Sequence, residues 1–466
     1  MSKLTAAELE SGTGGNLVYG SSDAIFPHVS IDTRKLQGED VFFAIHGPNQ
    51  DGHRYVPDAL SKGALGAVVE QDYVYPGEFP AGKVLIKVRD THEALKDLAK
   101  SARRRWPGTL VAVTGSMGKT TTREFAAHVL KSRFRVYQTP GNYNNLFGLP
   151  LALFGLAEDQ DLGIFEMGMS AKGEIAEMCR IASPEVGIIT NVAPVHLEFF
   201  GSLEDIARAK EELAEALPNN GTLIYNSDDL LVTEIAGRFA GRKISFGISS
   251  AADIRADQVE ITGLEETRFR ISWGGEHAKA SIPLAGAHYV MNVLAAVALG
   301  SRFGISLPRM VETFGTLSQA SMRGQLLRFK EGFAVIDDSY NSNPRALMKM
   351  IEVLSEMPSF TRRILVAGEM LELGSGSDSL HFECGSFAAA QGIDVVIGIG
   401  GAAREIVRAA VESGIPGSRA RFYPDVLSAV DAVSNELREG DLVLIKGSRG
   451  VHLEKIVEKL KSNFEF

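Results

Sequence analysis

The middle of the chain alternates fully apolar runs with amphipathic ones. Three apolar runs lie at 109–115, 162–168 and 186–192. They alternate with segments whose apolar residues have helical spacing, such as 119–132 after the first run and 204–218 after the third. Strands that are apolar on both faces are typical of a parallel sheet that helices cover on both sides. The pattern therefore predicts an α/β domain with a mostly parallel sheet.

Two further regions extend this organisation towards the C-terminus. Residues 254–284 alternate apolar and polar positions with a period of two, which predicts antiparallel strands within the same domain. From about residue 320 the strand and helix pattern restarts. Apolar runs lie at 333–340, 362–370, 395–400, 420–425 and 441–448, and a helical segment follows at 451–463. This repetition predicts a doubly wound, Rossmann-like unit.

The beginning of the chain has shorter apolar runs, at 41–45, 63–70 and 83–88, which indicate a small α/β domain. A chain of 466 residues exceeds what one hydrophobic core usually supports. We therefore expect three domains, at 1–107, 108–318 and 319–466. The basic cluster Arg103–Arg105 precedes Trp106, Pro107 and Gly108, so we expect it to lie in a solvated linker.

Composition and charge narrow the class of protein. A formal net charge of -10 disfavours general binding of nucleic acid, because a phosphate backbone attracts clustered Lys and Arg. No apolar run approaches the roughly 18 residues of a membrane helix, and the N-terminus lacks the pattern of a secretory signal. We therefore expect a cytoplasmic protein. Cys179 and Cys384 have no metal ligands at suitable spacing, and we expect both to be buried.

Residues 113–122 read Val-Thr-Gly-Ser-Met-Gly-Lys-Thr-Thr-Thr, between an apolar strand and an amphipathic helix. In such a loop, backbone N–H groups hold nucleotide phosphate, Lys119 reaches the terminal phosphates and Thr120 can ligate Mg²⁺. The strict pattern G-x-x-x-x-G-K-[ST] requires glycine where this chain has Val113, and the first glycine is Gly115. An ordinary turn with an exposed lysine is the alternative, but the flanking strand and helix favour phosphate binding.

Polar residues follow several predicted strands, where ligands of open α/β sheets bind. Glu166 and His196 could complete magnesium coordination near the phosphates, although a single strand-end histidine is more often structural. Lys210 lies in a helix rich in Glu, where a surface ion pair is the simplest role. Asp337 and Asp338 could hold a ribose or perform acid-base chemistry, and turn capping is the equal alternative.

These motifs together resemble the Mur ligase family of peptidoglycan precursor synthesis. The family's loop, T-G-[ST]-x-G-K-T, matches Thr114–Thr120, so the displaced glycine is the family's own variant. The likeness runs nearly end to end. Asp32–Arg34 and Asp51–His53 match the UDP-sugar module, and GNYNN at 141–145, EMGMSAKGEIA at 166–176, YNSNP at 340–344 and KGSRG at 446–450 match the branch that adds D-alanyl-D-alanine.

The resemblance implies a fold and an activity. The implied fold has a small α/β UDP-substrate domain, a central P-loop ATPase-like domain with a mostly parallel sheet, and a C-terminal Rossmann-like domain. The implied activity is ATP-dependent ligation of D-alanyl-D-alanine (D-Ala-D-Ala) to UDP-N-acetylmuramoyl-tripeptide (UDP-MurNAc-tripeptide) through an acyl phosphate. ATP and two Mg²⁺ ions are the implied cofactors, the substrates are small molecules, and a monomer is expected.

The resemblance also assigns roles to residues. Nucleotide contacts fall on Gly115, Ser116, Met117, Gly118, Lys119, Thr120, Thr121, His288, Asn292, Arg323 and Asp337. Substrate contacts fall on Asp32, Thr33, Arg34, Asn142, Asn145, Tyr340, Asn341 and Lys446. Magnesium ligands fall on Thr120, Glu166, His196 and Lys210, with Lys210 as a carbamylated lysine. The implied catalytic group is Lys119, His196 and Lys210.

Three positions depart from the family pattern: Glu369 stands where Asp is expected, Ser342 where Ala is commoner, and Glu211 where Gly is usual. Two alternatives stay open. One is an amide ligase of another branch, such as the MurE type. The other is a P-loop binding protein without ligase activity, although the sequence lacks the Asn-Lys-x-Asp motif of such switches. The motifs favour neither meso-diaminopimelate nor lysine as the third residue of the tripeptide.

Overall fold

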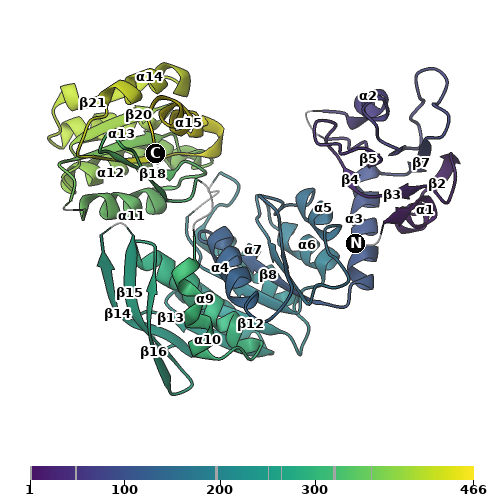
Figure 1. Cartoon of the computed structure of the whole chain (residues 1–466), viewed down its shortest axis with the longest axis horizontal. Coiled ribbons are helices and arrows are strands. Elements are labelled where there is room, and N and C mark those ends of the chain that lie inside the picture. The colour runs from purple at the N-terminus through teal and green to yellow at the C-terminus, as the bar shows by residue number, and fades with distance from the viewer. Residues whose placement is uncertain are drawn as a thin grey trace.

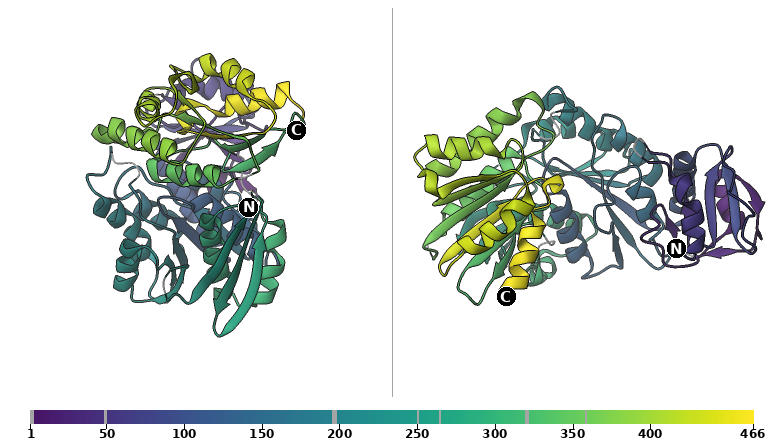
Figure 2. Two further views of the ribbon diagram at one scale, coloured as in Figure 1. Left: turned by 90° about the vertical axis from the view of Figure 1, so that its left-hand side faces the viewer. Right: turned by 90° about the horizontal axis from the view of Figure 1, so that it is seen from above.

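The computed structural model describes residues 3–47, 50–194, 198–249, 251–263, 265–318, 322–357 and 359–466. Three large sheets follow one another along the chain and confirm the predicted α/β class. The first part of the chain (purple) and the last part (yellow and green) stand apart on either side of the central part (Figure 1). The right view of Figure 2 shows this arrangement from above, with the first and last parts of the chain at opposite ends.

The first sheet has five strands in the order β2-β7-β6-β5-β4. Its strands are β2 (Asn16–Tyr19), β4 (Val29–Ser30), β5 (Val41–Phe43), β6 (Gly66–Glu70) and β7 (Val84–Val88), and β1 (Leu4–Thr5) pairs separately with β3 (Ile25–Phe26). The helices are α1 (Ala6–Thr13), α2 (Val56–Ser61), α3 (Thr91–Arg105) and the 3₁₀ turn η1 (Gly52–Tyr55). All three predicted apolar runs form strands, which run parallel to one another.

Helix α3 connects the first part to the central part without a break. It continues to Arg105 and packs against α5 (Gly148–Leu153) and α6 (Glu174–Ala182). Arg103 is buried, where it donates to the carbonyl of Ala182 at 2.8 Å and pairs with Glu185 at 2.8 Å. The expectation of a solvated linker is therefore wrong for Arg103, because its guanidinium bonds the carbonyl at the end of α6.

The central sheet has nine strands in the order β16-β15-β14-β13-β12-β11-β8-β10-β9. Seven are parallel: β8 (Thr109–Thr114), β9 (Val136–Gln138), β10 (Leu162–Glu166), β11 (Val186–Ile189), β12 (Thr222–Asn226), β13 (Arg242–Gly247) and β14 (Ile254–Thr262). Antiparallel β15 (Glu266–Trp273) and β16 (Glu276–Ile282) continue it. Both predictions, of parallel strands and of antiparallel strands at 254–284, are confirmed.

Helices cover both faces of the central sheet, which explains why its inner strands β8, β10 and β11 are buried almost throughout. One face carries α4 (Lys119–Leu130), α9 (Ala287–Arg302), α10 (Leu307–Glu312) and the 3₁₀ turn η2 (Phe314–Thr316). The other face carries α5, α6, α7 (Leu203–Ala216) and α8 (Leu230–Arg238). Because the parallel strands end at the same edge, loops after β8, β10 and β11 meet there.

The third sheet has six strands in the order β17-β18-β22-β19-β20-β21. Antiparallel β17 (Gln325–Arg328) borders parallel β18 (Ala334–Asp338), β22 (Asp441–Lys446), β19 (Arg362–Gly368), β20 (Val395–Ile399) and β21 (Ala420–Tyr423). Helices α11 (Pro344–Ser355), α12 (Ser377–Ala390) and α13 (Ala403–Glu412) cover one face, and α14 (Val426–Glu436) and α15 (Glu454–Asn463) the other. Short 3₁₀ turns are η3 (Gly374–Gly376), η4 (Gly417–Arg419) and η5 (Arg449–Val451). The doubly wound prediction is confirmed.

Two smaller expectations can also be compared with the structure. Cys179 and Cys384 are both buried and unpaired, as predicted. Among the helices that the structure describes, none combines the length and apolarity that a membrane crossing requires.

Candidate functional site

The predicted phosphate-binding loop connects β8 to α4 and turns sharply at two glycines. Gly115 has φ +146° and Gly118 has φ +78°. A Cβ atom on Gly115 would lie 1.9 Å from Oγ1 of Thr190, so this position accepts only glycine. Val113, in contrast, is fully buried within β8. The glycine therefore stands at 115 because the strand continues to Thr114 and the turn follows it.

The loop is held in shape by its surroundings. The N–H of Met117 donates to Oδ1 of Asn191 at 2.9 Å, and Nζ of Lys119 donates to the carbonyl of Gly115 at 2.8 Å. On the other side, Asn292 of α9 accepts from Oγ1 of Thr122 at 3.0 Å. The lysine is thus folded onto the loop, next to the N-terminus of α4, where an anion would bind.

Glu166 ends β10 directly beside the loop and is 2% exposed. Its Oε2 accepts from the hydroxyl of Thr120 at 2.7 Å, and its Oε1 accepts from the side-chain amide of Asn144 at 2.8 Å. Hydroxyl and carboxylate oxygens are the donors that Mg²⁺ prefers. The adjacent oxygens of Thr120 and Glu166 therefore fit a magnesium site. His196, the third predicted ligand, lies outside the described residues.

Lys210 lies on α7 and is 2% exposed. Among the described residues its ammonium has no hydrogen-bond acceptor, and burial, with Lys119 as a second cause, lowers its pKa well below the usual value. The surface ion pair is excluded, because Glu211 pairs with Arg238 and Glu212 accepts from the N–H groups of Gly173 and Ala176. A buried amine without a counter-ion needs a chemical explanation.

A cavity of about 740 Å³ opens between this loop and the third sheet. The predicted residues in its wall are Ser116, Met117, Gly118, Lys119, Thr120, Thr121, Asn142, Asn145, Glu166, His288, Asn292, Arg323, Tyr340, Asn341 and Lys446. Arg323 stacks on the ring of Tyr340 at 4.0 Å, and Lys446 donates to Asp338 at 2.6 Å and to the carbonyl of Asn341 at 2.9 Å. The third part of the chain therefore contributes a cationic wall opposite the loop.

The two acids at the end of β18 point in different directions. Asp338 lines the cavity, whereas Asp337 is 2% exposed and accepts from the N–H and hydroxyl of Ser339, at 3.2 and 2.6 Å. Successive residues of a strand project to opposite faces. The cavity wall therefore contains Asp338, whereas Asp337, the residue assigned from the sequence, lies outside it.

His288 lies at the start of α9, in the wall of the same cavity. Burial, together with the charges of Lys446 and Lys349, lowers the pKa of its imidazole to about 4. The ring is therefore neutral near pH 7, and it packs at 4.0 Å against the ring of Tyr289. A neutral imidazole and the amide of Asn292 can contact a purine base by stacking and hydrogen bonding.

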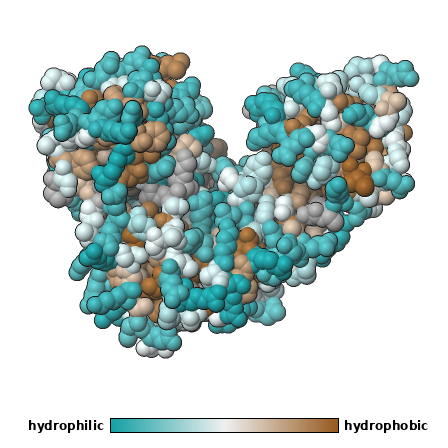
Figure 3. All heavy atoms as spheres, viewed as in Figure 1, coloured by the Kyte–Doolittle hydropathy of each residue, from teal (hydrophilic) through white to brown (hydrophobic). Residues whose placement is uncertain are grey.

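A second cavity, of about 1070 Å³, lies between the first and central parts of the chain. Its wall includes the predicted residues Asp32, Thr33 and Arg34. Arg34 donates to Asp32 at 2.9 Å, and this bond holds the pKa of the Asp32 carboxyl below its usual value. Figure 3 shows the hollow that separates the two outer parts above the central part.

The loop between β9 and α5, residues 139–147, is here named the crossing loop because it borders both cavities. Asn142, Asn145 and Phe147 line the first cavity and also the second. Asn145 additionally accepts from the N–H of Gly148 at 2.8 Å and so begins α5. A long ligand with one end near Asp32 would reach the phosphate-binding loop by passing the crossing loop.

The structure also assigns contacts to residues that the sequence analysis did not single out. Asn144 lies within the GNYNN motif, but only the fold shows that its amide holds Glu166. Arg123 follows Thr120 by one helical turn, and its guanidinium lies 3.5 Å from Glu166. The i, i+3 spacing on a helix could have indicated that Arg123 and Thr120 share a face.

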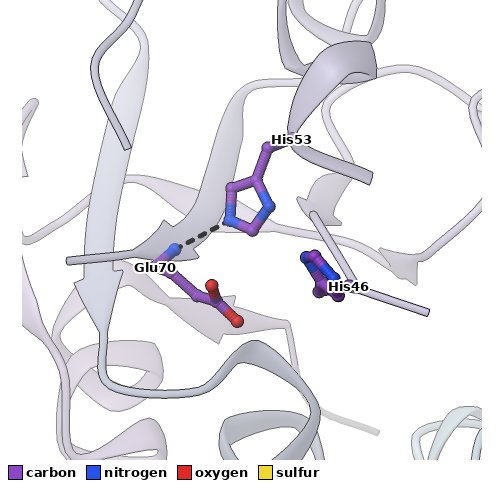
Figure 4. Close-up of side chains that lie close together, drawn as sticks. All are labelled: His46, His53 and Glu70. Atoms are coloured by element: carbon purple, nitrogen blue, oxygen red, sulfur yellow. Dashed lines mark hydrogen bonds between the residues drawn. The ribbon is translucent and has the colours of Figure 1, made fainter. Parts of the chain in front are cut away.

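One group of potential metal ligands lies outside both cavities within the described part of the chain: His46, His53 and Glu70 (Figure 4). Nε2 of His53 accepts from the N–H of Glu70 at 3.0 Å, and Nδ1 donates to Asp51 at 2.7 Å. Both ring nitrogens are occupied, so His53 has no lone pair for a metal. The group instead fastens η1 to β6.

Three family models match successive parts of the chain. Residues 26–103 match "Mur ligase family, catalytic domain", 113–300 match "Mur ligase middle domain", and 322–449 match "Mur ligase, glutamate ligase domain". The UDP-N-acetylmuramoyl-tripeptide--D-alanyl-D-alanine ligase of Bacillus subtilis is 34% identical, covering 97% of both chains. The enzyme of that name from Escherichia coli is 32% identical, covering 99% of both.

Solved structures of MurF proteins resemble this chain over nearly its whole length. MurF from Acinetobacter baumannii superposes with a TM-score of 0.87 at 26% identity, covering 99% of this chain and 100% of that one. MurF from Thermotoga maritima, in complex with ADP, gives a TM-score of 0.80 at 26% identity, covering 93% and 97%. The arrangement of all three parts is therefore shared with these proteins.

Proposed function

Since this chain belongs to the Mur ligase family, we propose that it joins D-Ala-D-Ala to UDP-MurNAc-tripeptide with conversion of ATP to ADP and phosphate. The observation that carries this proposal is the crossing loop, whose residues Asn142, Asn145 and Phe147 line both cavities. They offer a continuous path from Asp32 to Lys119. A substrate with a nucleotide at one end and a reactive carboxylate at the other requires such a path.

The proposed reaction has two steps. A carboxylate oxygen of the tripeptide attacks the γ-phosphorus of ATP, the bond to the β-phosphate oxygen breaks, and ADP leaves. The amine of D-Ala-D-Ala then attacks the acyl carbon, loses a proton, and expels phosphate as the carbon-oxygen bond breaks. Neither step needs a protein nucleophile, so positioning and charge neutralisation supply the catalysis.

We assign the central part to ATP. The N–H groups between Gly115 and Thr120 and the ammonium of Lys119 neutralise charge on the transferred phosphoryl group. Thr120 and Glu166 would hold magnesium, together with His196 and Lys210 by family resemblance. Mg²⁺ held there would neutralise charge that develops on the transferred phosphoryl group.

We propose that Lys210 is carbamylated. The neutral amine adds to the carbon of CO₂ and releases a proton, which turns a buried group without an acceptor into an anionic oxygen ligand. A ¹³C resonance of a carbamate should appear with ¹³C-bicarbonate in the unaltered chain and not in K210M. Its absence from both would contradict the carbamate while leaving the ligase proposal intact.

The outer parts take the remaining roles in this proposal. The first domain, 1–107, binds the UDP-sugar through Asp32–Arg34, and the third, 319–466, closes on the second, 108–318. Closure would bring Arg323 and Asp338 to the nucleotide and exclude water from the acyl phosphate. We propose a monomer that acts in the cytoplasm, where its nucleotide substrates are made. Small-angle scattering that shows no compaction with ADP and UDP-MurNAc-tripeptide would contradict closure.

A two-substrate assay tests the function. Phosphate release from ATP should require both UDP-MurNAc-tripeptide and D-Ala-D-Ala, and mass spectrometry should detect the pentapeptide. The assay is run with the meso-diaminopimelate and the L-lysine tripeptide to identify the natural substrate. ATP turnover that ignores both substrates would support a P-loop protein without ligase activity and overturn the proposal.

A further inference from the structure

The guanidinium of Arg123 is buried beside the phosphate-binding loop. Arg123 lies on α4, one turn after Thr120, and is 2% exposed. It lines neither cavity, so it does not touch a ligand in either. A buried cation is costly unless its surroundings bond it, and its position is therefore strongly constrained.

The donors of Arg123 reach two functional elements at once. Nη1 donates to the carbonyl of Gly141 at 3.0 Å and lies 3.5 Å from Oε2 of Glu166. Nη2 donates to Glu124 at 3.1 Å. Nε is buried and has no hydrogen-bond partner among the described residues. One side chain thus contacts the crossing loop and the carboxylate that we assign to magnesium.

Other contacts of the crossing loop go to β10 and the residues after it, and to His92 of α3, rather than to α4. Oγ1 of Thr139 accepts from the N–H of Glu166 at 3.2 Å, and the carbonyl of Asn144 accepts from the N–H of Gly168 at 2.7 Å. The bond from Arg123 to Gly141 joins the loop directly to the helix that follows the phosphate-binding loop. Gly141 immediately precedes Asn142, which lines both cavities.

We propose that Arg123 is a positioning residue with two separable effects: its donor fork fixes the crossing loop for the tripeptide, and its charge competes with the divalent cation for Glu166. The inference rests on the proposed function for its ligand at the crossing loop. Arg123 therefore tightens binding of the sugar-peptide and weakens binding of the metal ion. To bind Glu166, the metal ion must then displace the contact between Arg123 and this carboxylate.

Substitution of Arg123 should change the two affinities in opposite directions: the metal ion should bind more tightly and the sugar-peptide more weakly. R123M removes the charge and the donors, so Mn²⁺, measured by electron paramagnetic resonance with ADP present, should bind at least about fivefold more tightly. R123K keeps the charge but has one ammonium in place of a planar fork, so its Mn²⁺ affinity should stay within about twofold. Both variants should bind UDP-MurNAc-tripeptide more weakly by calorimetry, about tenfold in R123M and about threefold in R123K.

Arg103 provides a matched control. It is also buried and bonded to a carbonyl and a carboxylate, but it contacts Ala182 and Glu185, which line neither cavity. R103K should lower the melting temperature while leaving both affinities unchanged. Melting temperatures of all variants are compared, so that a general loss of stability is recognised, and R123K carries the test if R123M does not fold.

The Mn²⁺ measurement does not involve the sugar-peptide. Failure of the proposed function can therefore be distinguished from failure of the role proposed for Arg123. If the unaltered chain does not bind UDP-MurNAc-tripeptide, the proposed function fails. If it binds, but R123K binds equally well, the positioning role is overturned. Unchanged Mn²⁺ affinity in a folded R123M, or the same shifts in R103K, would overturn the competition with the metal ion.

Discussion

The side-chain amide of Asn144 donates to Oε1 of Glu166 at 2.8 Å, from the crossing loop, which also borders the second cavity. Because Thr120 donates to the other carboxylate oxygen at 2.7 Å, Glu166 is held from two sides. The orientation of this carboxylate therefore depends on a contact from the crossing loop.

Removing this contact should impair the metal site without unfolding the domain. N144A leaves Oε1 of Glu166 free to rotate away, and partners that orient a metal ligand typically contribute about 10–100-fold to activity. We expect kcat/KM for phosphate release to decrease by roughly that factor, with a raised requirement for Mg²⁺. The exposed Asn219 offers a control, since N219A should change neither. Full activity of N144A at low Mg²⁺ would mean that Thr120 and Arg123, which contact the other carboxylate oxygen, position Glu166 without Asn144.

The second glycine of the phosphate-binding loop should tolerate no side chain. Gly118 has φ +78°, and a Cβ there would lie 2.7 Å from Oδ1 of Asn292. We expect G118A to weaken ADP binding at least about tenfold, because the loop amides must move away from the phosphates. Calorimetry with ADP measures this loss.

Gly237 of α8 is the matched control for this substitution. Its added Cβ would have no atom within 4 Å. G237A should therefore leave ADP affinity unchanged and raise stability by about 0.4–1 kcal/mol, because it restricts the unfolded chain. Equal ADP affinities in the two alanine variants would show that the loop adapts.

His288 should make the stability of the central domain depend on pH. Its imidazole takes up a proton near pH 6.5 when unfolded but only near pH 4 in the folded chain, mainly because of burial. Between these values the unfolded state binds more protons, so the free energy of unfolding decreases as the pH is lowered from about 6.5 to about 4. H288Q should flatten this part of the curve in thermal melts. An identical slope in H288Q would assign the effect to other groups.

The predictability of this fold follows from burial on both faces of its strands. The stretches 395–399 and 442–445 contain no polar side chain because helices cover both sides of the sheet, and they stand out in the sequence. Strands β1, β3 and β4 have two residues each, too few for any periodicity, and they were not predicted. The end of helix α3 was predicted as a solvated linker because its three arginines resembled a polar segment, whereas Arg103 bonds the buried carbonyl of Ala182.

The site was predictable where chemistry requires a fixed spacing, and less so where it depends on tertiary contacts. The glycine-lysine-threonine loop can be recognised from the sequence, because a strand, a turn and a helix must follow one another directly. The burial of Lys210 could not be derived from a helix rich in Glu without the neighbouring α6, whose N-terminus engages Glu212. Whether Asp337 or Asp338 faces the cavity depends on how β18 lies in the third sheet. This can be decided only when the register of that sheet is known.

Glu369, which replaces the expected Asp, should require glycine at position 401, in the loop after β20. Its carboxylate accepts from the N–H of Ala402 at 2.9 Å, and a Cβ on Gly401 would lie 2.1 Å from its Oε1. G401A should therefore destabilise the third domain by about 1–3 kcal/mol, through this clash and through the φ of +30°.

Shortening the acid tests the coupling between these two positions. In E369D the carboxylate retreats by one methylene from the place where the new Cβ would lie, so G401A should cost less in that background, by at least about 0.5 kcal/mol. A double-mutant cycle from urea denaturation of the four proteins measures this difference. The strain at φ remains in both backgrounds and cancels in the cycle, so additive costs would show that Glu369 does not require Gly401.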